Sequence, residues 1–195
     1  MKKFLVLAGL AAVLAVPSFA ATTTWNLDPF HSNAQFVARH LGISNVQGEF
    51  TKISGTVQLD DQNIANSSVD VTIDATSIDT RVAMRDNDLK SEHFLDVAMY
   101  PTITFKSTKV EKSGDGYKVT GNLTIRGVTK EAVLNVGALS DARKDPMSRT
   151  GGFRRGAAAS LTVNRQDFGV AADPGMVGDE LAIQIDCEMT APAAQ

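Results

Sequence analysis

The chain has 195 residues, of which 43% are hydrophobic and 21% are charged, and its formal net charge is −3. That length suits one domain with a sizeable core, and the ordinary hydrophobic fraction excludes wholesale disorder. The acidic balance excludes a nucleic-acid-binding protein that relies on a basic face. The single cysteine excludes an internal disulfide framework and a multi-cysteine metal site.

The first 20 residues have the organisation of a cleavable export signal. Lys2 and Lys3 give a positive start, an apolar run covers 4–16, and Pro17 interrupts it before the triplet 18–20. As a helix this run would span ~20 Å, which is short of the ~30 Å hydrocarbon layer of a membrane. We therefore expect residues 1–20 to be removed, leaving a single domain over 21–195 without an integral membrane segment.

Apolar and polar residues alternate with a period of two through most of the remaining chain, which predicts strands with one buried face. Eight such runs lie at about 34–40, 46–59, 69–75, 102–111, 117–126, 128–137, 153–163 and 180–190. Within 46–59 the apolar positions change from even to odd numbers, which predicts a bulge near Thr51–Lys52. Cys187 shares the apolar face of the last run and is expected to be a core residue.

Three connections carry local signals. Glycine-containing turns at 113–116 and 126–127 join the runs between 102 and 137 into a three-stranded meander. Only the stretch 80–96 has helical spacing. The polar stretch 138–152 is predicted to be a loop at the rim of the fold and a candidate lid.

An antiparallel sheet of eight strands avoids exposed edges by closing into a barrel. Barrels of this size either are filled by side chains or enclose one small ligand. The predicted inward rows mix Phe36, Phe50 and Phe105 with small residues such as Ala38 and Gly121. This pattern leaves a packed core and an open apolar lumen as alternatives.

Local motifs for catalysis, phosphate binding or zinc binding are absent from the sequence. The histidines His31, His40 and His93 show no metal-ligand spacing, and His31 is expected to hold a turn by hydrogen bonds. Arg154 and Arg155 alternate, so at most one points inward and the other is expected to be solvated. The sequence therefore predicts no catalytic residue, metal or cofactor.

Five separated blocks resemble, in order, the YceI-like family, and together they cover 23–190. The blocks are 25–50 (opening Trp25-Asn-Leu-Asp-Pro-Phe-His31-Ser32), 77–107 (with Met84-Arg-Asp86 and Tyr100-Pro-Thr-Ile-Thr-Phe105), 121–129, 164–169 and 177–180. One departure is at Asn87 and Asp88, where many family members carry a histidine. A role assigned to that histidine does not transfer to this chain.

The resemblance implies an all-β fold, an eight-stranded antiparallel lipocalin-like barrel with one short helical segment at about 80–96. It implies a periplasmic protein, because family members are exported bacterial proteins. Some members bind polyisoprenoid or other long-chain amphiphiles, which favours the open lumen. The expected partner is thus a long-chain isoprenoid, of polyprenyl or quinone type, or a similar fatty amphiphile, with no nucleic acid. Dimers occur in the family, so a homodimer is compatible with the resemblance.

The predicted ligand-binding residues fall into three groups. Phe36, Phe50, Phe105, Leu123, Ile125 and Phe153 line the tube, with Ala38 and Gly121 leaving room. Met84 and Phe94 lie near one mouth, and His40 and Arg85 contact a head group. Two alternatives stay open: an enzyme acting on such a lipid with His40 as acid or base, and a stress-related interaction protein with a filled barrel.

Overall fold

The computed structural model describes residues 22–149 and 151–193, so the export signal predicted over 1–20 lies outside the described residues. The helix α1 covers Ala83–Lys90, and 3-10 turns occupy Ile64–Asn66 (η1), Ala75–Ser77 (η2) and Arg165–Phe168 (η3). The strands are β1 (Thr23–Leu27), β2 (Asn33–His40), β3 (Ser44–Phe50), β4 (Ile53–Leu59), β5 (Ser68–Asp74), β6 (Ile78–Asp79), β7 (Thr102–Ser113), β8 (Gly116–Ile125), β9 (Val128–Val136), β10 (Arg143–Lys144), β11 (Phe153–Asn164) and β12 (Val177–Ala191).

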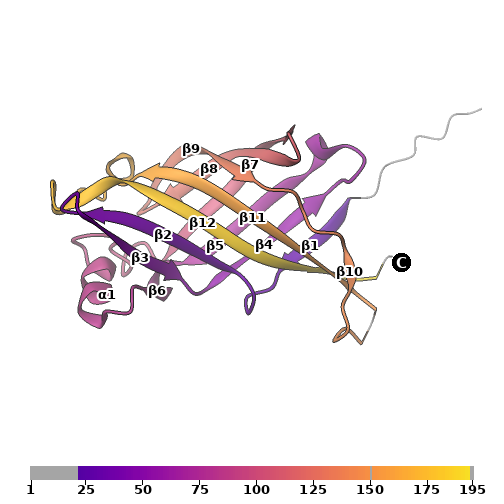
Figure 1. The fold of residues 1–195 in the computed structure, drawn as a ribbon, viewed down its shortest axis with the longest axis horizontal. Helices are drawn as coiled ribbons and strands as arrows, with labels where there is room; N and C mark the ends of the chain where they lie inside the picture. Colours follow the sequence, from indigo (N-terminus) through magenta and orange to yellow (C-terminus); the bar gives the residue numbers. More distant parts are fainter. Residues whose placement is uncertain (1–21, 150, 194–195) are drawn as a thin grey trace, which may run out of the picture.

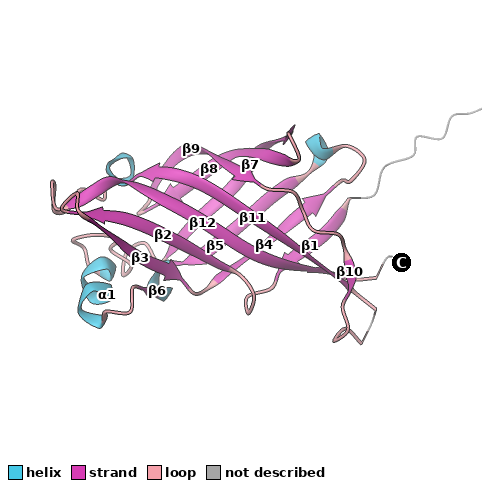
Figure 2. Cartoon of the chain, viewed as in Figure 1, coloured by secondary structure: helices cyan, strands magenta, loops and turns pink. Residues whose placement is uncertain are grey.

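These strands close into an antiparallel barrel with eight strand positions, which confirms the predicted fold (Figures 1 and 2). The ring runs β11–β9–β8–β7–β5–β4–β1–β12 and returns to β11. Strands β1 and β2 both pair with β12, one after the other along its length, and so share one position in the ring. Strand β4 pairs with β1 and β3 pairs with β2, so β3 and β4 share the next position. Strand β12 pairs with β11 on one side and with β2 on the other. It therefore presents no long unpaired edge in the closed barrel.

The change of phase predicted at Thr51–Lys52 separates β3 from β4. Phe50, an even-numbered residue, faces the interior in β3, whereas the odd-numbered Ile53 and Leu59 are buried in β4. The two residues between the strands turn the alternation over, so both halves of the bent strand keep their apolar side chains inside. The pattern missed β1, whose buried Trp25 and Leu27 form too short an alternation to be read as a strand.

The meander of β7, β8 and β9 also has the predicted turns. Gly114 (φ +57°) and Gly127 (φ +72°) adopt the left-handed backbone that such tight hairpins need. An irregularity between Ser107 and Lys109 was not predicted. It allows Phe105 and Val110, which have opposite parity, both to be buried.

The predicted helix over 80–96 is too long, because α1 covers only Ala83–Lys90. A carboxylate oxygen of Asp86 accepts hydrogen bonds from the backbone N–H (2.8 Å) and the hydroxyl (2.6 Å) of Thr80. These bonds hold 80–82 in a non-helical approach, and Arg81 has a left-handed φ of +64°. After Ser91 the chain continues as turns that carry Phe94 inward.

The two ends of the barrel interior differ. Toward the β10 end, on the right in Figure 1, a cluster of Trp25, Leu27, Ile53, Leu59, Met189 and Ala191 fills the core. Leu139 and Phe153 pack against this cluster, so the described part of the stretch 138–152 runs along the filled end. The prediction that this loop is a lid over the lumen is therefore wrong. A bore open from end to end is excluded by the same cluster.

Candidate functional site

The other end of the interior, beside α1, contains a cavity of about 190 Å³. Its wall comes from most of the strands, from α1 and the turn after it, and from η3. Apart from Gln35, Thr104 and Arg165, every described lining residue is apolar. A cavity with this lining offers almost no hydrogen-bonding group to a ligand, so it suits hydrocarbon.

Most of the ligand-binding residues predicted from the sequence meet at this cavity. Phe36, Ala38, Phe50, Phe94, Phe105, Leu123 and Ile125 all line it. The rings of Phe36 and Phe50 contact each other, with centroids 5.9 Å apart. Their contact with a ligand stays a prediction, but the structure does bring them together in one wall.

Five predicted residues, Gly121 among them, are not part of this lining. The side chain of Met84 is 82% exposed on α1. Arg85 donates to the hydroxyl (2.8 Å) and the carbonyl (2.9 Å) of Thr80, so it holds the segment before α1 in place. Phe153 packs in the filled cluster, and His40, the last residue of β2, is outside the cavity lining.

Gly121 makes room for the protein itself rather than for a ligand. A Cβ atom there would lie 2.5 Å from the carbonyl oxygen of Lys106 and 2.6 Å from the ring of Phe105. Both contacts are far shorter than van der Waals distance, and one of them is with backbone. The glycine therefore permits the close approach of β7 and the inward seat of Phe105, which corrects the prediction that it leaves space in the lumen.

Arg165 is a lining residue that the sequence analysis missed. It is 3% exposed, and its guanidinium donates to the carbonyls of Val170, Ala172, Val177 and Gly178 at 2.6–3.2 Å. A carboxylate oxygen of Asp179 lies 3.1 Å away. The guanidinium thus donates four hydrogen bonds and forms an ion pair with Asp179, so Arg165 ties η3 and the loop after it to β12. Only its place inside the block 164–169 could have drawn attention to it.

Residues of β12 show where the cavity ends. Leu181, Ile183 and Ile185 point inward and are half-buried, because they face empty space, whereas Met189 is 2% exposed. Cys187 lies between them, half-buried against the filled cluster as a core residue. Burial raises the pKa of its thiol, which favours the unreactive protonated form.

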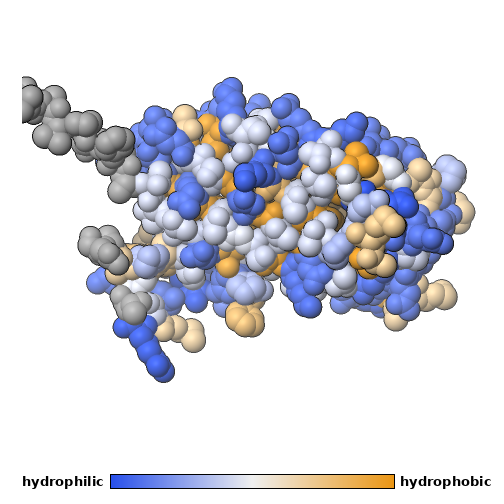
Figure 3. Space-filling view, turned by 180° about the vertical axis from the view of Figure 1, so that it is seen from behind, coloured by the Kyte–Doolittle hydropathy of each residue, from blue (hydrophilic) through white to orange (hydrophobic). Residues whose placement is uncertain are grey.

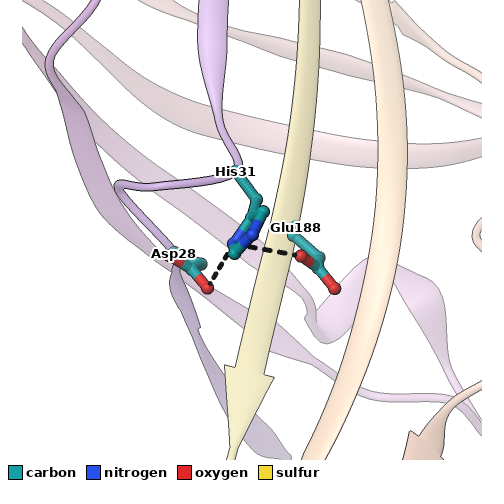
Figure 4. A group of neighbouring side chains, drawn as sticks. All are labelled: Asp28, His31 and Glu188. Atoms are coloured by element: carbon teal, nitrogen blue, oxygen red, sulfur yellow. Dashed lines mark hydrogen bonds and ion pairs between the residues drawn. The ribbon is translucent and has the colours of Figure 1, made fainter.

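An ionic cluster lies on the outer side of the filled end (Figure 4). The Nδ1 atom of His31 is 3.0 Å from a carboxylate oxygen of Asp28 and 3.4 Å from one of Glu188, which joins the β1–β2 turn to β12. This confirms that His31 holds a turn. Arg154 lies 2.6 Å from Asp28 and 3.1 Å from Asp145, so it is engaged in ion pairs rather than solvated.

The inward arginine of this pair is Arg155, which packs over the ring of Trp25 with 5.7 Å between the guanidinium carbon and the ring centroid. It also donates to the carbonyl of Ser140 at 2.8 Å. Arg155 thereby covers the filled end of the barrel. The structure therefore agrees with the prediction that at most one of the two arginines points inward. The prediction that the other is solvated is wrong, because Arg154 forms ion pairs.

The electrostatics of Asp28 follow from these contacts. Burial of the side chain alone raises its pKa, but hydrogen bonds from Arg154, His31 and the backbone N–H of Phe30 outweigh burial and lower the pKa to about 2. The pKa of Asp145 is lowered as well, first by the backbone N–H of Met147 and then by Arg154. Both carboxyl groups are therefore charged at neutral pH.

Two groups of side chains have spacings that a metal ion could use. The ligand atoms of Asp28, His31 and Glu188 lie within 4.8 Å of one another, as do those of Asp88, His93 and Asp173. In the first group Arg154 already supplies the positive charge between the carboxylates. In the second, each carboxylate already pairs with the imidazole: Asp88 lies 3.2 Å from Nδ1 of His93, and Asp173 lies 3.7 Å from Nε2. We interpret both groups as ionic contacts.

The family of the chain follows from its sequence. Residues 25–189 match the YceI-like domain. The chain belongs to the YceI-like family. A YceI-like relative from Yersinia pestis, named UPF0312 protein, is 36% identical over 181 residues, which cover 92% of each chain.

Solved structures agree with this assignment. The YceI protein of Campylobacter jejuni is 32% identical, with a TM-score of 0.67 over 80% of this chain and 90% of that one. A polyisoprenoid binding domain from Saccharophagus degradans, implicated in plant cell wall breakdown, is 17% identical, with a TM-score of 0.61 over 87% and 99% of the two chains. The second likeness shows a shared fold. Among the described residues, none of the helices is long and apolar enough to span a bilayer.

Proposed function

We propose that the protein is a periplasmic carrier or scavenger that holds the hydrocarbon end of a long-chain isoprenoid, of polyprenyl or quinone type. The observation that carries this proposal is the apolar cavity beside α1, whose lining includes the predicted residues Phe36, Phe50 and Phe105. The export signal predicted over 1–20 supports the location. The related fold named for polyisoprenoid binding supports the class of ligand.

The size of the cavity limits how the ligand sits. A cavity of ~150 Å³ holds one benzene molecule, so about 190 Å³ accepts one short hydrocarbon segment. Six buried carbons contribute ~5 kcal/mol, most of which association costs of ~4 kcal/mol or more cancel. Micromolar affinity needs ~8 kcal/mol net. A longer chain must therefore widen the cavity, and the half-buried Leu181, Ile183 and Ile185 are the side chains with room to move.

The polar end of the ligand stays in water in this proposal. Arg165 is the charged residue of the described lining, and the protein itself holds its guanidinium with four carbonyls and the carboxylate of Asp179. Nothing in the wall offers a free charge to a phosphate, and no carboxylate, histidine or thiol of the described lining could serve as acid, base or nucleophile. We therefore propose binding rather than catalysis, with little preference for the head group.

The proposal is tested by filling the cavity. Ala38 lines it, whereas Ala182 on the neighbouring strand β12 pairs with Val37 and has its side chain exposed on the outer face. Ala38→Phe should weaken binding of prenyl alcohols at least tenfold, whereas Ala182→Phe should leave it unchanged. Titration with alcohols of increasing length measures both, with melting curves to show that the variants fold. Equal affinity of Ala38→Phe and the unmodified protein would contradict binding in this cavity.

A native mass spectrum of the protein purified from the periplasm gives an independent readout. We expect an adduct with the mass of an isoprenoid lipid, which Ala38→Phe loses and Ala182→Phe retains. A spectrum without any lipid adduct, at every growth condition, would favour the interaction protein with no ligand over the carrier.

A further inference from the structure

Exposed apolar side chains gather at the end of the barrel that contains the cavity. They are Leu41 (50% exposed), Ile43 (77%), Val82 (42%), Met84 (82%), Met99 (67%) and Met176 (49%). We call these six residues the rim. In Figure 3 this end lies on the right, where tan and orange side chains stand out among blue ones. Large apolar side chains exposed together mark an interaction surface.

Each segment that carries a rim residue also supplies part of the cavity wall or lies next to it in the chain. On α1, Met84 is exposed and Leu89 lines the cavity, and in the turns after it Met99 is exposed and Leu95 lines it. Met176 directly precedes the lining residue Val177.

The two hairpin-end segments of the rim are joined to each other. The backbone N–H of Leu41 donates to the carbonyl of Met176 at 2.7 Å, which holds the β2–β3 turn against the loop before β12. Since the same loops form the rim and the cavity end, a partner that covers the rim also meets the cavity.

The charges around the rim select among partners. Between Asp79 and Met99 the chain carries the acids Asp79, Asp86, Asp88, Glu92 and Asp96 but only the bases Arg81, Arg85 and Lys90. This excess of acid offers no attraction to an anionic surface. The apolar side chains, in contrast, gain from burial in the interface of any bilayer.

From this arrangement we infer that the rim docks on an uncharged, zwitterionic lipid surface, with the cavity facing the acyl region. This inference rests on the proposed function, since a hydrocarbon ligand that is insoluble in water has to enter the cavity from a lipid phase. The rim side chains enter the bilayer interface, and the ligand passes into the cavity without crossing bulk water.

The test uses the mature protein and phosphatidylcholine vesicles that contain no isoprenoid. We expect the protein to co-float with the vesicles equally at low and high salt, because apolar burial rather than charge drives docking. The double variant Ile43→Ser/Met99→Ser should lower the partition coefficient by about tenfold for each side chain removed. Its melting temperature should match that of the unmodified protein, since both side chains are exposed.

A matched control lies on the other side of the molecule. Phe30 (90% exposed) and Met147 (84%) flank the Asp28 cluster, away from the cavity. Phe30→Ser/Met147→Ser should co-float like the unmodified protein. Docking is overturned if the protein does not co-float, if high salt releases it, or if the control loses as much binding as the rim variant.

Failure of docking and failure of the proposed function give different results. Prenyl alcohols titrated in solution report on the cavity without a membrane, and Ile43→Ser/Met99→Ser should bind them normally. If vesicle binding follows the rim while Ala38→Phe leaves alcohol binding unchanged, docking stands and the carrier function falls. The reverse pattern leaves the carrier without this docking surface.

Discussion

The contacts of Asp28 link the stability of the barrel to pH. Its pKa is about 2 in the folded protein, held there against burial by Arg154, His31 and the N–H of Phe30, and ~3.9 in an unfolded chain. Because the folded value is the lower one, the stabilisation is complete above about pH 4 and is lost as the pH falls to about 2. The shift corresponds to about 2.6 kcal/mol at most.

We therefore expect Asp28→Asn to lower the free energy of unfolding at pH 7 by up to about 2.6 kcal/mol. The variant should also lose less stability than the unmodified protein between pH 4 and pH 2. Urea unfolding at several pH values measures both quantities. Asp141→Asn, at an exposed aspartate of the loop before β10, is the control and should behave like the unmodified protein. An Asp28→Asn curve parallel to that of the unmodified protein over this pH range would refute the role of Asp28.

The sequence could predict the face on which a residue lies better than what it contacts there. Alternation placed Phe36, Phe105 and Leu123 inside, and all three line the cavity. It could not show that β7 approaches Gly121 so closely that the glycine serves packing, nor that Arg165 meets four carbonyls and Asp179. Such contacts join segments far apart in the chain, and no local period records them.

The loop after η3 depends on Arg165. Its guanidinium donates to the carbonyls of Val170, Ala172, Val177 and Gly178, and these bonds are lost if the planar group is removed. A lysine keeps the charge but has three donors instead of five. Arg165→Lys should therefore leave at least one of the four carbonyls unsatisfied, at a cost of about 1 kcal/mol or more.

Amide hydrogen exchange locates this effect. In Arg165→Lys the amides of 170–177 should exchange faster than in the unmodified protein, while those of β7 and β8 are protected as before. Arg126→Lys is the comparison, because Arg126 also bridges two carbonyls, of Gly169 and Glu92, but is less buried. Its effect should be smaller. Exchange in Arg165→Lys that matches Arg126→Lys would show that the buried guanidinium does not hold this loop.

At the level of elements, long runs of alternating residues were sufficient to predict the strands, but short segments were not predicted correctly. All eight predicted runs are strand positions of the barrel, and the phase change at Thr51–Lys52 marks the bend between β3 and β4. The helix was overextended because Asp86 binds Thr80 and so delays its start to Ala83. The loop 138–152 was misplaced because its polar composition gives no information about which end of the barrel it covers.

The whole molecule is a barrel that is filled at one end and hollow at the other. Sequence pattern had left a packed core and an open lumen as alternatives, and the structure contains both. The filled half, around Trp25 and Met189, supplies packing that does not depend on a ligand. The half that contains the cavity also has a cluster of buried side chains, among them Phe105, Leu123 and Phe168, but the space between them and Leu181 is not filled and can take a hydrocarbon chain.

This division predicts unequal costs for the same substitution in the two halves. Leu59 is 3% exposed in the filled cluster, and Leu181 is half-buried on the cavity wall. Leu59→Ala opens a new hole in packed surroundings and should lower the free energy of unfolding by about 2–5 kcal/mol. Leu181→Ala only enlarges a cavity that already exists, so its cost should be about 1 kcal/mol.

Urea unfolding of the two lipid-free variants measures this difference in stability. A second set of unfolding curves, with the proteins saturated with a prenyl alcohol, measures how much the ligand stabilises each variant. A bound chain packs against Leu181 but does not reach Leu59, so the ligand should stabilise the unmodified protein more than Leu181→Ala and should stabilise Leu59→Ala fully. Equal losses for the two leucines in the lipid-free protein would mean that Leu181 is packed in solution. The hollow half would then be closed, and a hydrocarbon chain would have to displace a formed core rather than enter an existing space.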